Sequence, residues 1–519
     1  MPALRLSRAA ALAAAAGAAA LQLAFPAPAH ALEGPTADVA LHGDYRLRAV
    51  WLADLPLDAA GTLLGQSAFA EHRLRISPEI RFRTFEFHGE LDLFDGPFAG
   101  DASIDFVEPI RARDRVTPIP RGKARYLWAV WNAPVARLQA GLMGSRWGLG
   151  LLASDGTGQD DDFGDDFYGD RSLRVLVATR PLLLASKGKS TRGAPLALVV
   201  AADLVLEDET ARYSRGDRAY EGVAALLWSE GADGKPAGLG EGEREAGAYL
   251  VYRSLTDAAG GKLGVLAADV YGRLVLARGP DRWTFAAEAV VLAGQGTVAR
   301  SLSAPDGHSL LAAGAVVRAE HERGKVGAVL ELGWASGDAS TDDDKITSFK
   351  FDPDYNVGLL MFDEALAWQS ARSADLLADP DLVGVPPNGV ALLPTNGSVT
   401  NALYANWRGK LRPTEKLELV LGLLTAVAPY PVVDPYNTFR NGGVPQNYLG
   451  GAPGRFYGVE TDLALRWKVR LPKFGTFGDK PSAWTLQGGW MVPGNVFRDA
   501  SSRRMPQLWE VVLRLWLAW

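Results

Sequence analysis

The chain has 519 residues, no cysteine and a formal net charge of -6 at pH 7. The lack of cysteine argues against a lipoprotein anchor, thiolate metal sites and a disulfide framework. It also suits a protein exported into an oxidising compartment. The mild acidity predicts no nucleic-acid partner.

The first 31 residues have the layout of a secretory signal peptide. Arg5 and Arg8 precede an apolar, Ala-rich run over 9–25, and Ala29-His30-Ala31 has the small-x-small pattern of a cleavage site. An anchored N-terminal helix is the alternative, but the run is short for a membrane span. We therefore expect a signal peptide over 1–31 and a mature chain over 32–519.

The next segments alternate between apolar and polar residues, and Glu71 to Arg83 shows this most clearly. One face would carry His72, Leu74, Ile76, Pro78, Ile80 and Phe82. The other would carry Glu71, Arg73, Arg75, Ser77, Glu79, Arg81 and Arg83. A strand separates such residues into two walls, whereas a helix would scatter them around its circumference.

Similar segments recur to the end of the chain and predict eighteen strands, with a range of sixteen to twenty. They are 39–51, 70–82, 84–94, 122–132, 135–145, 171–184, 195–206, 219–229, 247–256, 263–277, 283–294, 309–321, 325–336, 399–411, 416–428, 456–470, 483–493 and 508–519. Most are near the ~9–11 residues of a tilted membrane strand. No run after residue 32 approaches a membrane helix, and the mean hydropathy of -0.01 fits alternating lipid-facing and lumen-facing residues.

The connections favour an all-β, antiparallel, up-and-down transmembrane β-barrel. If the N-terminus is periplasmic, odd connections are external and should be long, whereas even ones should be short periplasmic turns. The long connections 95–121, 146–170, 337–398 and 429–455 are odd, and the short connection 132–134 is even. The connection 230–246 is long where a short turn is expected, and 257–262 is short where a long loop is expected. The positions of one strand pair in this part of the chain therefore stay open.

The last strand ends on Trp519, and its residues alternate between two sets. One set is Trp509, Val511, Leu513, Leu515, Leu517 and Trp519, and the other is Glu510, Val512, Arg514, Trp516 and Ala518. This resembles the C-terminal strand that the barrel-assembly machinery reads, so Trp519 is predicted to be an assembly signal. An ordinary edge strand is the alternative, although an exposed apolar edge risks aggregation. Aromatic residues also stand near many strand ends, as interfacial girdles would require: Tyr45, Trp51, Tyr126, Trp128, Tyr249, Tyr252, Trp283, Trp334, Trp407, Trp484 and Trp490.

Eighteen strands leave an aqueous lumen unless a loop fills it. The predicted basic lining is Arg73, Arg75, Arg81 and Arg83, with Lys123, Arg125 and Arg137 as further candidates. The acidic external loop 146–170 contributes Asp160, Asp161, Asp162, Asp165 and Asp166. Fixed charges at close quarters are how such pores select ions. The alternative is that the acidic loop is only solvated.

The external loop 336–398 is long enough to be functional or disordered. Its apolar segment from Val357 to Ala378 predicts a short helix, which suits a plug, a lid, a trimer contact or an external cap. The acidic run Asp160 to Asp166 lacks the spacing of a calcium-binding loop, so neither a metal nor a cofactor is predicted.

Two loop motifs carry a resemblance: Arg146 to Leu152 with the acidic loop after it, and Asp342 to Thr347 through Phe351 to Asn356. They resemble an uncharacterised family of bacterial outer-membrane barrels that shares general features with alginate-export and carbohydrate porins. The resemblance implies a porin in which the third external loop folds inward and its acidic residues face a basic wall. It also suggests a homotrimer, which no residue of the sequence decides.

The predicted function is passive diffusion of small polar or charged solutes through the outer membrane. A plugged structural or adhesive barrel and a polysaccharide-export barrel remain alternatives. A barrel hydrolase is less favoured, because the sequence has no G-x-S-x-G elbow and His72 falls on the lipid face. The expected partners are outer-membrane lipid, the assembly machinery and small solutes.

Overall fold

We analysed a computed structural model of the chain. It describes residues 37–519 except Gln66 and 101–121, 157–161, 165–168, 183–194, 233–234, 301–303, 341–342, 380–381, 383–392 and 470–481. The chain divides into the units Met1–Asp38 and Val39–Trp519, and the following sections concern the second. The predicted signal peptide lies outside the described residues.

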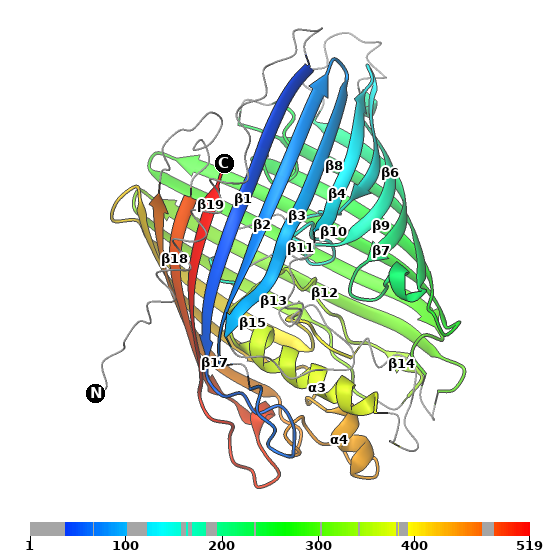
Figure 1. Cartoon of the computed structure of the whole chain (residues 1–519), viewed down its shortest axis with the longest axis vertical. Helices are drawn as coiled ribbons and strands as arrows, with labels where there is room; N and C mark the ends of the chain where they lie inside the picture. Colours follow the sequence, from blue (N-terminus) through cyan, green and yellow to red (C-terminus); the bar gives the residue numbers. More distant parts are fainter. Residues whose placement is uncertain are drawn as a thin grey trace. The chain divides into compact units, whose positions relative to one another are not determined.

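Val39–Trp519 contains a closed antiparallel barrel of eighteen strands (Figure 1). The strands are β1 Ala37–Leu52, β2 Ala68–Phe82, β3 Phe85–Gly100, β4 Lys123–Asn132, β5 Ala136–Met143, β6 Arg171–Thr179, β7 Leu196–Glu207, β8 Arg218–Glu230, β9 Arg244–Thr256, β10 Lys262–Arg278, β11 Asp281–Gly296, β12 His308–Arg323, β13 Val326–Ala335, β15 Ala402–Leu411, β16 Leu417–Val427, β17 Phe456–Val469, β18 Ser482–Pro493 and β19 Leu508–Ala518. The two-residue strand β14, Lys345–Ile346, lies in the long loop and pairs parallel to β12. The predicted barrel and its count of eighteen are confirmed.

The barrel closes between its first and last strands. β1 pairs antiparallel to β19, from Asp44 opposite Ala518 to Leu52 opposite Glu510. The Trp519 N–H donates to the Gly43 carbonyl at 3.0 Å, and the Gly43 N–H donates to the Trp519 carbonyl at 3.0 Å. A Cβ on Gly43 would lie 2.6 Å from the Trp519 ring, so glycine is required for this close approach.

The strands adjoining the two irregular connections are where the sequence places them. β8 ends at Glu230 and β9 begins at Arg244, while β9 and β10 are joined by 257–261. β8, β9 and β10 pair in sequence, so no strand pair was misplaced. The longer connection lies at the end of the short turns, and its isolated bridge between Glu230 and Pro236 continues the hairpin beyond β8.

Side chains alternate between an exposed apolar face and a buried polar face. On β19, Trp509 is 47% exposed, whereas Glu510 and Arg514 are buried. A lipid bilayer accommodates such an apolar outer face, and closure removes the unpaired strand edges that lipid cannot satisfy. The protein is therefore an outer-membrane β-barrel. Among the helices that the structure describes, none is both long and apolar enough to span a bilayer.

The helical segments belong to the connections. The long loop carries a π-helical turn, η3 Met361–Leu366, followed by α3 Ala367–Leu377, so helix begins four residues later than the sequence predicted. The β16–β17 connection contains α4 Pro435–Arg440, which Asp434 caps by accepting the N–H groups of Tyr436 and Asn437. Two short 3₁₀ turns are η2 Tyr213–Arg215 and η5 Asn495–Phe497.

Not every aromatic residue near a strand end belongs to a girdle. Trp283, Trp334, Trp407 and Trp484 are exposed on the outer face, as predicted. Tyr126 and Tyr249 are buried instead. Strand parity turns these two side chains inward, where they meet a loop, so the prediction was wrong for them.

Candidate channel interior

The third external connection, between β5 and β6, folds into the barrel. Trp147 donates its indole N–H to Asp269 of β10 at 3.0 Å and stacks on Tyr249, with ring centroids 5.3 Å apart. The Leu151 N–H donates to Glu288 of β11 at 3.1 Å, and the Leu149 N–H donates to the same carboxylate. Carboxylates on the wall therefore hold the first part of this loop, Asp269 through the Trp147 side chain and Glu288 through the backbone.

The same loop continues to β15 and β18. Asp162 forms ion pairs with Arg408 at 3.2 Å and Lys410 at 2.9 Å, both on β15. Its carbonyl accepts a hydrogen bond from Gln487 of β18 at 3.3 Å. An acidic residue of the loop thus faces two basic residues, and both of these lie on β15.

Two further contacts seat the tip of the loop. Arg514 of β19 donates to the Gly164 carbonyl at 3.3 Å. A Cβ on Gly422 of β16 would lie 2.6 Å from the Phe163 ring, so this glycine makes room for the ring. Before the tip, the Asp155 carbonyl lies 2.8 Å from the Tyr126 hydroxyl, and on the return the Asp170 carbonyl lies 3.1 Å from it. The other predicted loop acids, Asp160, Asp161, Asp165 and Asp166, lie outside the described residues.

The predicted basic lining, Arg73, Arg75, Arg81 and Arg83, divides into buried residues and residues at the rim. Arg73 is 1% exposed and pairs with Asp44 at 3.2 Å. Arg75 is also buried; it pairs with Asp92 at 2.7 Å and Glu90 at 3.1 Å. Both lie on the inner face, where neighbouring strands compensate their charges.

Arg81 and Arg83 are at the end of the same hairpin. The Arg81 side chain is 59% exposed and pairs with Glu79. Arg83 belongs to the turn between β2 and β3, with φ of +55°, and its guanidinium lies 5.2 Å from the Phe82 ring centroid. The four arginines therefore occupy two environments, and only Arg81 and Arg83 lie at the rim where the turns are short.

The further basic candidates also differ from one another. Arg125 is buried and pairs with Glu90, whereas Lys123 reaches Glu207 at 2.9 Å. Arg137 has a 46% exposed side chain and lies 3.4 Å from Glu86.

A second set of buried ion pairs lines β6 to β9. Arg174 pairs with Asp203 at 2.7 Å, and Arg253 lies between Asp208 and Glu221, 3.0 Å from the latter. Asp203 belongs to β7 and Glu221 to β8, while Asp208 directly follows β7. The attraction within such a pair offsets the free energy of removing both charges from water only when the geometry is good and the remaining polar atoms are hydrogen-bonded.

The long loop is held inside the wall by one carboxylate and by apolar packing. Glu460 of β17 accepts the N–H groups of Leu359, Leu360 and Met361 at 2.6, 2.9 and 2.7 Å. This carboxylate satisfies donors at the start of η3 that have no acceptor within the helix. Trp368 and Leu360 are buried in a core shared with residues of β11 to β18.

The long loop also forms hydrogen bonds with the third loop. Asp352 accepts the Ser154 N–H at 3.0 Å, and Asp354 accepts the Gly169 N–H at 2.8 Å. Both acids belong to the Phe351 to Asn356 motif, so this motif joins the two loops. Neither loop can move away from the other without breaking these contacts.

Burial shifts two groups in the connections. It raises the pKa of the Asp434 carboxyl to about 6 and lowers the pKa of the Lys350 ammonium to about 8, since each loses solvation of its charged form. Lys350 donates to the Pro394 carbonyl at 3.1 Å, while Ser373 of α3 donates to Asp434.

The histidines have varied surroundings. His72 packs on Phe94 of the outer face, with ring centroids 4.4 Å apart, in keeping with the predicted lipid-facing position. The His308 ring lies 2.8 Å from the Ala299 carbonyl in an external connection. His321 lies 2.9 Å from Asp281 and stacks on Trp283.

Sequence reasoning missed Arg408, Lys410, Glu288 and Glu460. All four alternate inward on predicted strands, so parity could have placed them on the wall. Their loop partners lie between 99 and 248 positions away, as the sequence numbering shows, and no local pattern announces such contacts.

Three solved structures illustrate the known barrels that this chain resembles. Pseudomonas aeruginosa OccK5 (OpdH) is 10% identical over 93% of this chain and 98% of that chain, with a TM-score of 0.47. P. aeruginosa OpdK with vanillate is 12% identical over 92% of this chain and 99% of that chain, with a TM-score of 0.47. Acinetobacter baumannii OccAB1 is 10% identical over 92% of this chain and 96% of that chain, with a TM-score of 0.47. Similarity at this level transfers no substrate and no residue role.

No protein-family model and no curated protein matches the chain. The porin-like architecture is confirmed by the barrel itself, with its inward-folded third loop. The closer resemblance to an uncharacterised family, and through it to alginate-export and carbohydrate porins, stays a prediction.

Proposed function

We propose that the barrel is a passive channel for small polar or charged solutes. The observation that carries this proposal is the path of the third external connection, which runs inside a closed eighteen-strand barrel and brings Asp162 against Arg408 and Lys410. A barrel of this size has room for a lumen, and an inward loop bearing fixed charge narrows it selectively. We infer that it acts without catalysis.

We further propose that the acidic loop and the basic wall form the constriction. The acidic side is Asp160, Asp161, Asp162, Asp165 and Asp166, and the basic side is Arg73, Arg75, Arg81 and Arg83. The inward position of Asp162 and the inner-face positions of Arg73 and Arg75 support this assignment. Arg408 and Lys410 extend the basic side.

Single-channel conductance of the refolded protein in a planar bilayer tests the channel. We expect discrete current steps whose size rises with salt concentration. The protein should first show heat-modifiable migration, which reports a folded barrel. A folded barrel that passes no current would contradict the proposal and favour a plugged structural or adhesive role.

The plugged alternative has a specific observation in its favour, namely the apolar core that the long loop forms within the wall. Deleting 341–398 and joining the ends with a short Gly/Ser linker separates the two functions. A channel that already conducts should keep its steps, with larger conductance. Steps that appear only after the deletion would show that this loop plugs the barrel.

We propose that the C-terminal strand directs assembly, with outer-membrane lipid around the barrel. Trp519 supports this role, since its backbone pairs with Gly43 of β1 where the barrel closes. A homotrimer stays a prediction, and sedimentation of the detergent-solubilised protein measures it.

A further inference from the structure

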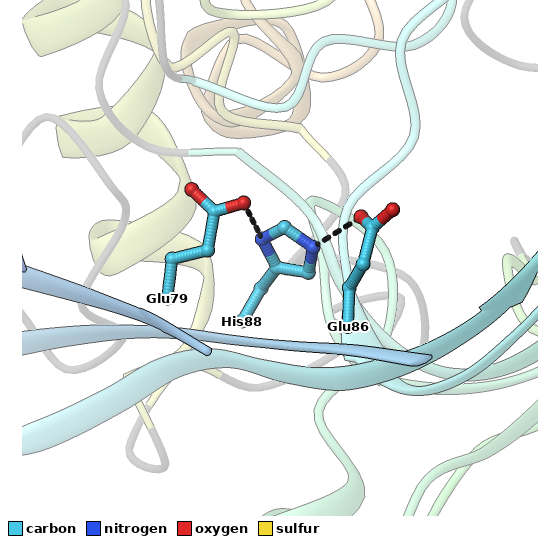
Figure 2. A group of neighbouring side chains, drawn as sticks. All are labelled: Glu79, Glu86 and His88. Carbon is cyan, nitrogen blue, oxygen red and sulfur yellow. Dashed lines mark hydrogen bonds and ion pairs between the residues drawn. The ribbon is translucent and has the colours of Figure 1, made fainter. Parts of the chain in front are cut away.

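A compact cluster at the short-turn end of β2 and β3 brings together one imidazole and two carboxylates (Figure 2). Glu79 lies directly opposite His88 across the hairpin, and Glu86 is two residues before His88 on β3. A side-chain period of two places all three on one face. The two-residue turn at 83–84 fixes this register.

The imidazole stands between the two carboxylates. His88 Nδ1 lies 3.8 Å from Glu79 Oε1, and His88 Nε2 lies 3.0 Å from Glu86 Oε2. One ligand atom from each residue can be chosen so that all three lie within 4.8 Å of one another. Two atoms bound at ~2.1 Å to one tetrahedral ion are roughly 3.4 Å apart, so the three side chains must turn toward one ring nitrogen to bind the same ion.

The neighbouring residues orient this cluster. The His88 ring stacks on Trp128 of β4, with centroids 4.8 Å apart and an interplanar angle of 9°. Asn132 donates to Glu86 at 2.5 Å, and Arg81 donates to Glu79 at 2.5 Å. Hydrogen bonds to ligating carboxylates and a fixed ring are the outer contacts that support metal sites.

Access and charge are compatible with an entering cation. The three side chains are 16–19% exposed, so water and ions reach them. Arg81 and Arg137 compete for the carboxylates, but their side chains are 59% and 46% exposed and can turn into solvent. By the rule that short turns are periplasmic, the cluster lies at the periplasmic mouth.

We propose that Glu79, Glu86 and His88 bind a divalent first-row transition-metal ion. Imidazole nitrogen with carboxylate oxygen suits ions such as Zn²⁺ and Cu²⁺, whereas Mg²⁺ and Ca²⁺ favour oxygen alone. The site adds a metal-binding property to the barrel and does not depend on solute passage.

The outer wall offers a matched control. His321 also stacks on a tryptophan, Trp283, with centroids 4.1 Å apart, and lies 2.9 Å from Asp281. Within the described residues, Glu79, Glu86 and His88 are the only group of three or more side chains that could hold a metal ion. Histidine–tryptophan stacking beside one carboxylate is thus present at His321 without the second carboxylate.

Equilibrium dialysis of the refolded, untagged barrel against Zn²⁺ tests the proposal. We expect one bound equivalent, a loss of at least tenfold in affinity in H88A and in the double variant E79Q/E86Q, and no change in H321A. Cu²⁺ bound in place of zinc should show, by electron paramagnetic resonance, one imidazole nitrogen that H88A removes.

The result that overturns the proposal is a wild type that binds no zinc, or an H88A variant that binds as wild type does. Either would leave the cluster as a hydrogen-bonded array that takes no metal. Heat-modifiable migration checks that each variant is folded. If H88A does not fold, the near-isosteric E79Q/E86Q variant decides the question.

Discussion

Two regions of the barrel wall are stabilised by different means. Across β1–β4 and β6–β9, the wall holds itself together through ion pairs between adjacent strands, such as Arg75 with Asp92 and Arg174 with Asp203. Across β11–β18, adjacent strands also form ion pairs, such as Arg408 with Glu331, but the long loop adds a second source of stability. Its residues Leu360 and Trp368 pack into an apolar core, and Glu460 binds the loop backbone.

In the first region the charged side chains of the wall stabilise one another, whereas in the second region the inner surface of the wall depends on a loop that covers it. Cross-strand pairs form wherever the register brings opposite charges together, without help from a connection. An apolar inner wall requires a cover, because exposed apolar surface in a lumen loses hydrophobic stabilisation. The first region should therefore respond to charge substitutions and the second to changes that release the loop.

The largest effect on stability is expected among the four arginines of the predicted basic lining, Arg73, Arg75, Arg81 and Arg83. R75A leaves Asp92 without its buried partner, whereas Glu90 keeps its pair with Arg125, and the loss costs about 3–5 kcal/mol of unfolding free energy. R81A removes an exposed pair and costs less than about 1 kcal/mol. Urea unfolding followed by tryptophan fluorescence measures both. Equal losses would mean that the two arginines share one environment.

The charge of the same four arginines should also govern ion selectivity. Replacing Arg73, Arg75, Arg81 and Arg83 by alanine removes four positive charges from the inner face and the rim, so the reversal potential in a salt gradient should shift toward cations. R218A is the control, because Arg218 lies at an external strand end over Tyr213. An unchanged potential would exclude these arginines from the constriction.

The second region should loosen when its carboxylate anchor is changed. E460Q keeps the side-chain shape but loses the negative charge and one acceptor oxygen, which costs about 2–3 kcal/mol for the loop N–H groups left poorly satisfied. We expect faster proteolysis within 336–401 while the barrel stays folded. E322Q, at a partly exposed carboxylate paired with Arg412, should not change the cleavage rate.

The contact that joins the two regions should have an intermediate effect. D162N removes the charge that faces Arg408 and Lys410, at a cost of about 2 kcal/mol, because Arg408 keeps its pair with Glu331. The uncovered positive charge should shift the reversal potential toward anions. D499N, in an external connection, is the control. A shift toward cations in D162N would contradict this assignment.

The smallest effect concerns pH and is confined to α4. Burial raises the pKa of Asp434 to about 6 in the folded protein, so the native state binds more protons than the unfolded state between about pH 4 and 6. Stability of this segment should therefore fall as pH rises through that window and level off above it. Amide-exchange protection of 435–440, corrected for intrinsic rates, measures the change. D434N preserves the N-cap but should remove the pH dependence.

The sequence by itself determined the barrel. Alternation in segments such as 71–83 and 509–519 specifies strands with one apolar face, and the lengths of the connections order them. Even the irregular connection 231–243 left the strand positions correct, because the pairing of β8 with β9 depends on their side-chain period. Tyr126 and Tyr249 were misassigned because proximity to a strand end was given more weight than parity.

Only the tertiary structure decided what the interior contains. The sequence placed an acidic loop and a basic lining in one lumen, but it could not show that Asp162 meets Arg408 and Lys410 while Arg73 meets Asp44. Local alternation specifies which way a side chain points and carries no information about which distant strand faces it. Pairing across the lumen depends on closure of β1 on β19, which sets the positions of all the inward side chains at once.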